Sequence, residues 1–276
     1  MKKQNKEQKQ NAPKIKQNNS FSENLKKSIE KAQKEAEILA IEKQKEEHAG
    51  EVADFLASEL LDDSVEEVSD LVKGLLAKGI LACLAGSSDN GKSALARQLC
   101  ACVVTGKDFL SWKVTPTYHR AVYISTEDDK RALKKNFISL QNNELQLNKE
   151  ELGRIRFIVE TDNILAHLDE LLSKESADIV ILDTFTDVFF GELYQANKVR
   201  EFFIGYHKLC LKYGCSILII THTNKRSEDL RPDKNNITGS QAIEAKMRLV
   251  CELRTNKGNL NKKYLCILKA NYLEPN

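Results

Sequence analysis

The fold of this chain is decided at residues 86–93, which read Gly86-Ser87-Ser88-Asp89-Asn90-Gly91-Lys92-Ser93. The stretch fits the pattern G-x-x-x-x-G-K-[ST], in which glycines let backbone N–H groups approach phosphate oxygens closely. Lys92 would reach the β- and γ-phosphates as a point charge, and the Ser93 hydroxyl would bind Mg²⁺. All eight residues are therefore predicted to bind a nucleotide, with ATP and Mg²⁺ as the expected ligands.

The residues on either side are those that such a loop requires. The apolar run at residues 80–84 predicts a strand that enters the loop. The pattern Ala94, Leu95 and Leu99 predicts a helix that leaves it. This helix would start near Gly91 and direct its positive end at the anion. A chance match would not need this strand and helix around it, so we interpret residues 86–93 as a phosphate-binding loop.

Beyond this loop, apolar runs alternate with helical patterns. We predict strands at residues 80–85, 121–125, 156–159, 178–183, 216–221, 248–254 and 264–270, and helices at 92–104, 130–141, 163–172 and 199–213. Several strands are almost entirely apolar, which indicates burial on both faces of a parallel sheet. The last two, joined by a polar stretch with Gly258, predict an antiparallel hairpin at the sheet edge. Residues 79–276 are thus expected to form an α/β fold with a mostly parallel sheet flanked by helices.

The first 78 residues have a different composition. Residues 1–50 are rich in Lys, Glu, Gln and Asn, so we expect a flexible, charged extension that is disordered to partly helical. Apolar residues recur at helical spacing between residues 51 and 78: Val52, Phe55, Leu56, Leu60, Val68, Leu71, Val72 and Leu75. We expect an amphipathic helical lead-in there, and we expect its part around residues 52–61 to dock on an adjacent subunit.

Composition argues against several protein classes. No apolar run approaches the roughly 20 residues of a membrane helix, and the N-terminus is too polar for a secretory signal. The seven cysteines form no C-x-x-C pair, so zinc-ribbon and thioredoxin sites lack support. The formal net charge of +2 neither requires nor excludes nucleic acid. We expect a cytoplasmic protein with buried, reduced thiols and no membrane partner.

Asp183 ends the predicted strand at residues 178–183. Ligands bind at the carboxyl ends of strands in parallel sheets, so Asp183 could hold Mg²⁺ together with Ser93. A strand-ending aspartate can also be a helix cap or turn former. With the phosphate-binding loop upstream, we predict the metal role, and Thr184 beside it would help to orient the site.

Glu127 follows the predicted strand at residues 121–125, which we expect beside the strand that enters the phosphate-binding loop. A carboxylate at this place can orient, or take a proton from, the water that attacks the γ-phosphate. Asp128 and Asp129 compete for this role. Their other role would be to cap the helix that starts near Lys130, where acids offset the helix dipole.

Five segments together resemble the RecA-like ATPases of the RepA-type replicative helicase group: residues 79–99, 123–129, 178–184, 217–224 and 239–254. KaiC-like ATPases and the DnaB-type helicase motor are more distant relatives. The connector Gly106-Lys107-Asp108-Phe109-Leu110-Ser111-Trp112-Lys113 is also similar to one in this group. The resemblance runs from about residue 71 to the end. It implies a RecA-like fold and a homo-oligomeric ring, commonly a hexamer, with ATP between neighbouring subunits.

The resemblance also implies roles for single residues. Glu127 matches the catalytic glutamate, and His222 matches the polar residue that senses the γ-phosphate, although a surface histidine at a strand end would look the same. Arg248 matches a basic residue that reaches into the neighbour's ATP site, with Arg254 and Lys269 as alternatives. DnaB-type motors use a Lys-x-Arg for this work, and here the corresponding Lys269-Ala270-Asn271 lacks the arginine.

Residues 223–238 form a long charged segment, which in RecA-like rings faces the central channel and touches single-stranded DNA. Four basic residues could pair with phosphates: Lys225, Arg226, Arg231 and Lys234. Three acids and the lack of an aromatic ring weaken this interpretation.

On the resemblance as a whole, we favour a small replicative or plasmid-type DNA helicase. One alternative is a KaiC-like regulatory or loader ATPase that acts on a protein without unwinding DNA. Another is a nucleotide-gated assembly module, against which the intact Lys92, Asp183 and Glu127 argue.

Overall fold

The computed structural model of this chain describes residues 56–61, 67–141, 145–159, 162–224, 230–238 and 240–272. The chain divides into two units, Met1–Glu66 and Glu67–Asn276. In the described part of the first unit, Ala57–Leu61 form a short 3-10 helix, η1, on which Leu60 and Leu61 are exposed. The helical pattern expected around Val52 and Phe55 lies outside the described residues.

A seven-stranded sheet with the order β5-β4-β6-β7-β3-β8-β9 forms the centre of the second unit. Its strands are β3 (Leu81–Ala85), β4 (Ala121–Ser125), β5 (Ile155–Ile158), β6 (Ile179–Asp183), β7 (Ser216–Ile220), β8 (Leu249–Asn256) and β9 (Asn259–Ala270). Every neighbouring pair is parallel except β8 and β9, which are antiparallel. The predicted parallel sheet with an edge hairpin is confirmed.

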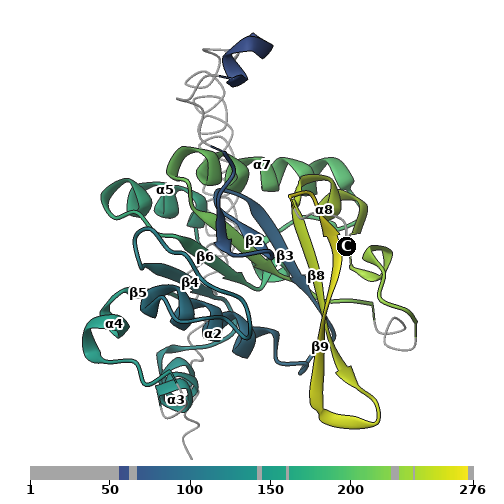
Figure 1. The fold of residues 1–276 in the computed structure, drawn as a ribbon. Coiled ribbons are helices and arrows are strands. Elements are labelled where there is room, and N and C mark those ends of the chain that lie inside the picture. Colours follow the sequence, from purple (N-terminus) through teal and green to yellow (C-terminus); the bar gives the residue numbers. More distant parts are fainter. Residues whose placement is uncertain are drawn as a thin grey trace, which may run out of the picture. The chain divides into compact units, whose positions relative to one another are not determined.

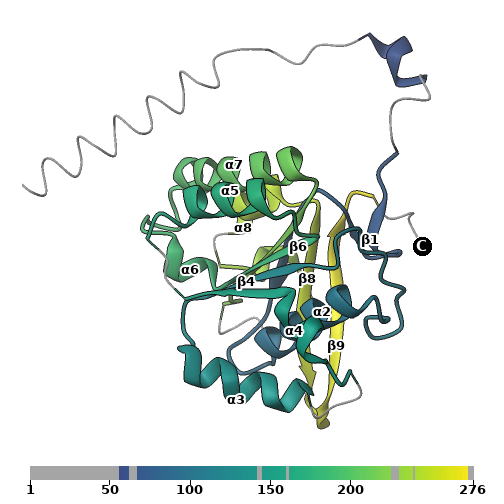
Figure 2. The same cartoon turned by 90° about the vertical axis from the view of Figure 1, so that its left-hand side faces the viewer.

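Helices cover both faces of this sheet (Figures 1 and 2). One face carries α2 (Lys92–Thr105), α3 (Lys130–Gln141) and α4 (Lys149–Gly153), and the other carries α5 (Ile164–Lys174), α7 (Ala196–Tyr213) and α8 (Ser240–Lys246). Each layer has its own apolar cluster against the sheet. Because both faces are covered, β3, β4, β6 and β7 are buried along their whole length. No helix in the described ranges has the length and apolar character to cross a membrane.

The helix expected over the second half of residues 51–78 is wrong. There, β1 (Asp70–Val72) and β2 (Leu76–Ala77) form a small antiparallel pair. Gly74 has a φ of 70°, and its N–H donates to the Asp70 carboxylate at 3.0 Å. A left-handed glycine with an aspartate four residues earlier stabilises a tight turn. Leu71, Val72 and Leu75 are buried as expected, but they lie on β1 and in the turn after it, and Val68 is exposed.

Most other elements lie within a few residues of their expected bounds. The largest difference is in the edge hairpin, because β8 and β9 continue until only Lys257 and Gly258 lie between them. In the described residues, three short α-helices were not predicted, namely α4, α6 (Phe185–Val188) and α8, nor was the 3-10 helix η3 (Lys234–Asn236). Six of the seven cysteines are buried and all are unpaired, in keeping with their expected role as small apolar residues.

Candidate active site

The phosphate-binding loop connects β3 to α2, which begins at Lys92. Gly91 has a φ of 85°, which glycine adopts without strain. A Cβ on Gly86 would lie 2.7 Å from the carbonyl oxygen of Leu253 on β8. The first glycine is therefore needed because the loop passes directly over the backbone of the neighbouring strand.

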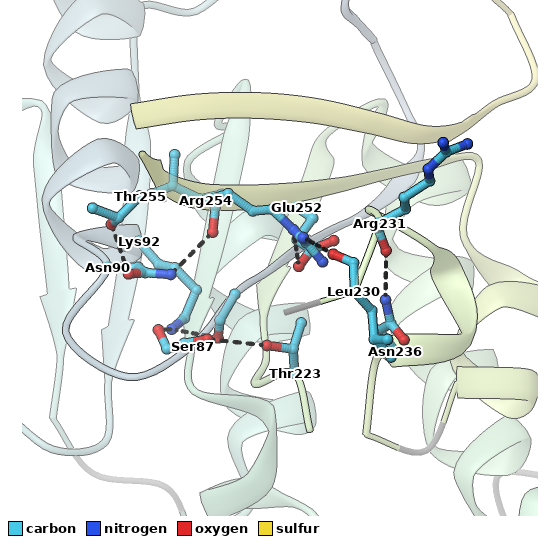
Figure 3. Close-up of polar contacts among 12 residues, drawn as sticks. Ser87, Asn90, Lys92, Thr223, Leu230, Arg231, Asn236, Glu252, Arg254 and Thr255 are labelled. Atoms are coloured by element: carbon cyan, nitrogen blue, oxygen red, sulfur yellow. Dashed lines mark hydrogen bonds and ion pairs between the residues drawn. The ribbon is translucent and has the colours of Figure 1, made fainter. Parts of the chain in front are cut away.

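Lys92 is buried beneath this loop. Its Nζ donates to the carbonyl oxygens of Gly86 at 2.9 Å and Ser87 at 2.7 Å (Figure 3). Burial lowers the pKa of Lys92, whereas the carboxylates of Asp183, Glu127 and Asp89 raise it. The lysine thus lies within electrostatic reach of these three carboxylates. The half-buried Ser93 follows it in the first turn of α2.

Asp183 lies at the end of β6 and is buried. One carboxylate oxygen accepts a hydrogen bond from the hydroxyl of Tyr123, a fully buried residue of β4. Burial and the nearby Asp183 raise the pKa of Tyr123, so its hydroxyl stays a donor. The backbone N–H of Thr126 donates to the Asp183 carbonyl oxygen at 2.9 Å, and the peptide bond from Asp183 to Thr184 is cis. The carboxylate is thus held in place from the neighbouring strand.

Glu127 is exposed just beyond β4. The expectation that this strand lies beside the strand of the phosphate-binding loop is wrong, because β6 and β7 lie between β4 and β3. Parallel strands nevertheless present their carboxyl ends at one edge. The charge of Glu127 raises the pKa of both Lys92 and His222, so the side chain belongs to the same site.

The two acids that follow Glu127 have separate contacts. Asp129 accepts from the N–H groups of Arg131 at 3.0 Å and Ala132 at 2.9 Å, so it caps α3. These hydrogen bonds lower its pKa. Asp128 accepts from Asn136 Nδ2 at 3.0 Å and lies 3.7 Å from Arg97 Nη1 of α2. Both competitors are engaged in holding the segment, which leaves Glu127 as the exposed acid that acts electrostatically on Lys92 and His222.

His222 follows β7, which lies between β6 and β3 in the sheet, and β3 is the strand that leads into the phosphate-binding loop. Burial and then Lys92 lower its pKa, against the carboxylates of Glu127, Asp183 and Asp187. Its Nδ1 is buried without a hydrogen-bond partner in the described part of the chain. A buried imidazole nitrogen without a partner, a buried lysine and an oriented carboxylate together fit a bound nucleotide phosphate and its Mg²⁺.

Arg248 is not brought to this site. It lies at the amino end of β8, where its backbone N–H donates to the carbonyl oxygen of Leu81 at the start of β3. The two alternative cations also have other partners. Arg254 Nε donates to Glu252 Oε1 at 2.8 Å, and Lys269 Nζ donates to the Glu244 carbonyl oxygen at 2.8 Å.

A pocket of about 410 Å³ separates the phosphate-binding loop from the β8–β9 hairpin. Its polar wall includes Asn90, Thr255 and Lys263. Thr255 Oγ1 donates to Asn90 Oδ1 at 2.8 Å, and Lys263 Nζ donates to Thr255 Oγ1 at 3.1 Å. Reasoning from the sequence did not identify the hairpin residues, because no local motif links them to residues 86–93.

The charged segment after β7 contacts both of these elements (Figure 3). The Thr223 N–H donates to the Gly86 carbonyl oxygen at 3.3 Å, and Arg254 donates to the carbonyl oxygen of Leu230. Of the predicted phosphate-binding residues, Arg231 and Lys234 are exposed, and Lys234 Nζ forms an ion pair with Glu244 Oε1 at 2.6 Å. Lys225 and Arg226 lie outside the described residues, as does Gly239 at the start of the resembling segment 239–254.

Two comparisons with known proteins identify the fold and the family. A KaiC-like protein from the hyperthermophilic archaeon Pyrococcus horikoshii OT3 has a similar structure, with a TM-score of 0.54 and 18% sequence identity over 75% of this chain and 88% of that one. No curated protein matches the sequence. A family model described as AAA domain (AAA_25) matches residues 46–228, about two-thirds of the chain. The chain therefore belongs to this AAA domain family of P-loop ATPases.

Proposed function

We propose that this chain hydrolyses ATP with Mg²⁺ and couples hydrolysis to single-stranded DNA as an oligomeric motor. The observation that supports the hydrolase assignment is that Lys92, Glu127, Asp183 and His222 lie at or after the carboxyl ends of four different strands, at one edge of the sheet, within electrostatic reach of one another. Bound Mg²⁺ would neutralise charge on the phosphates.

Each predicted site residue has a defined role in this proposal. Lys92 exchanges two carbonyl partners for phosphate oxygens, and Ser93 with Asp183 holds the metal. Glu127 accepts a hydrogen bond from the attacking water, and its exposed carboxylate leaves room for that water. His222 presents its unpartnered Nδ1 to the γ-phosphate.

Arg248 acts in this proposal on the ATP of a neighbouring subunit in a homo-oligomer, for which a hexamer is our expectation. Its support is position: the residue is exposed at the edge of the sheet opposite its own phosphate-binding loop. The test mixes Arg248→Ala subunits with Lys92→Ala subunits. Each is inactive alone, and we expect activity to return on mixing, because some sites combine an intact loop with an intact arginine. No recovery would exclude the role in trans.

The first experiment measures ATP hydrolysis with and without single-stranded DNA. Lys92→Ala should lose ATP binding, and Glu127→Gln should keep binding while its rate falls by about 10²–10⁴-fold. Stimulation by DNA that both variants abolish would support the motor. A rate that depends on both residues and ignores DNA would retain the ATPase but replace the motor by a regulatory or loader ATPase that acts on a protein.

A further inference from the structure

The β8–β9 hairpin is basic beyond Glu252. Residues 253–272 contain five lysines and arginines and no aspartate or glutamate: Arg254, Lys257, Lys262, Lys263 and Lys269. The far end of the hairpin extends beyond the other strands (Figure 1). A protruding cationic strand pair is complementary in charge to a polyanion.

The two faces of this hairpin have different surroundings. Thr255 and Lys263, which are paired across the strands, face the phosphate-binding loop through Asn90. Side chains alternate along a strand, so Lys262 and Tyr264 lie on the opposite side, which we call the outer face, and Arg254, which also lines the pocket, borders it. Tyr264 lies directly opposite Arg254 in the register.

The outer face adjoins the charged segment after β7. Arg254 donates to the Leu230 carbonyl oxygen, which places this face beside Arg231 (Figure 3). Arg231 is exposed, and its carbonyl oxygen is held by Asn236 Nδ2 at 3.0 Å. A basic strip therefore continues from the hairpin onto the segment that we expect to touch DNA.

Tyr264 gives this strip the aromatic ring that residues 223–238 lack. The side chain is 44% exposed. Its hydroxyl accepts a hydrogen bond from Asn256 Nδ2 at 2.6 Å, and Lys262 Nζ lies over the ring, 5.5 Å from its centroid. A half-exposed aromatic ring with a neighbouring exposed ammonium group is the combination that binds an unpaired base and its phosphate.

We propose that the outer face of the β8–β9 hairpin binds single-stranded nucleic acid, with a base stacked on Tyr264 and phosphates paired with Lys262 and Arg231. The inference rests on the proposed coupling to DNA and names the surface that performs it. Neither Tyr264 nor Lys262 lines the pocket beside the phosphate-binding loop. Changes to these two residues should therefore leave ATP hydrolysis without DNA unaltered.

The test measures binding of a fluorescein-labelled oligothymidylate of about 20 nucleotides by fluorescence anisotropy over a range of salt concentrations. Tyr264→Ser should raise Kd about tenfold by removing one stacked base, whereas Tyr264→Phe, which keeps the ring, should bind like wild type. Lys262→Gln should reduce the slope of log K against log salt by about 0.7. Lys149→Gln, an exposed lysine at the start of α4, is the matched control and should change neither quantity.

The outcomes separate this inference from the proposed function. If Tyr264→Ser and Lys262→Gln bind the oligonucleotide like wild type and keep DNA-stimulated hydrolysis, the hairpin interface alone is overturned. Loss of binding with Lys262→Gln but not with Tyr264→Ser would overturn the stacked base. If Tyr264→Ser weakens the binding of a duplex of the same length to an equal extent, the stacked base is also overturned, because paired bases are not free to stack on the ring. No binding to wild type would overturn the proposed DNA coupling itself. Unchanged melting temperatures confirm that the exposed substitutions leave the fold intact.

Discussion

The hydroxyl of Tyr123 donates a hydrogen bond to Oδ2 of Asp183 and thereby ties β4 to the end of β6 beneath the candidate metal site. This hydrogen bond fixes one carboxylate oxygen of Asp183, so the geometry of that carboxylate depends on the buried Tyr123. Tyr123→Phe keeps the ring and removes this donor. Since partners that orient metal ligands typically contribute 10–100-fold to affinity or activity, we expect a loss of roughly this size in kcat/KM and a higher half-saturating Mg²⁺ concentration.

The matched control for this change is Tyr206→Phe on α7. The Tyr206 hydroxyl is also buried, but it has no partner in the part of the chain that the structure describes. Its removal should leave both Mg²⁺ dependence and stability close to those of wild type. Calorimetric titration of ADP with and without Mg²⁺ gives a second readout. Equal behaviour of the two phenylalanine variants would contradict an orienting role for Tyr123.

Asp128 and Asp129 should separate activity from stability. Asp129→Ala removes the cap of α3, which costs about 0.5–2 kcal/mol of unfolding free energy, and should leave kcat nearly unchanged. Asp128→Ala releases the contacts with Asn136 and Arg97 that hold the segment after β4. We expect its main effect on kcat, measured beside urea denaturation of both variants. The opposite pattern would mean that Asp129 orients Glu127.

Gly86→Ala should disturb the contact between the phosphate-binding loop and β8. The added Cβ would lie 2.7 Å from a backbone oxygen of Leu253, so one of the two segments must move. Overpacking of this kind costs typically about 1–3 kcal/mol, and nucleotide binding should weaken with it. Gly153→Ala is the control, because its Cβ would have no neighbour within 4 Å. Thermal melting that shows the same small change for both would contradict the close approach.

The stability of the protein should fall on acidification partly through His222. Its pKa in the folded state lies below the ordinary value, because burial and Lys92 disfavour the imidazolium. The unfolded histidine binds a proton near pH 6.5 while the folded one remains neutral. Lowering the pH through that value therefore favours unfolding, by at most about 1.4 kcal/mol per pH unit for one group.

His222→Asn should flatten this dependence when unfolding by urea is compared between about pH 7.5 and about pH 5.5. His207 needs its own variant, because burial, Lys246 and Arg248 lower its pKa in the same direction. We expect His222→Asn and His207→Asn each to reduce the slope, and the double variant to reduce it further. A slope that His222→Asn leaves unchanged would contradict the lowered pKa.

The sequence was sufficient to predict the features that depend on local patterns. Residues 86–93 with their strand and helix, the buried strands, Asp183 at a strand end and the edge hairpin all follow from periodicity and short motifs. The small β1–β2 pair was missed because Leu71, Val72 and Leu75 also fit a helical spacing. Gly74 after Asp70 was the available signal for a turn.

The sequence could not show which distant segments meet. The order of strands places β6 and β7 between β4 and β3, and nothing within residues 121–129 reports this. Tyr123 is a typical strand residue, so its hydrogen bond to Asp183 depends on the pairing of β4 with β6. The contact between Arg254 and Leu230 likewise requires the tertiary structure.

In the proposed function, the carbonyl partners of Lys92 set the conditions under which a nucleotide binds. The ammonium group already has two short hydrogen bonds, to Gly86 and Ser87, beneath a loop that is folded over it. A phosphate that binds Lys92 would therefore replace hydrogen bonds to backbone carbonyl oxygens rather than hydrogen bonds to water. Recognition becomes an exchange reaction, in which affinity measures how much better a phosphate satisfies Lys92 than its own backbone does.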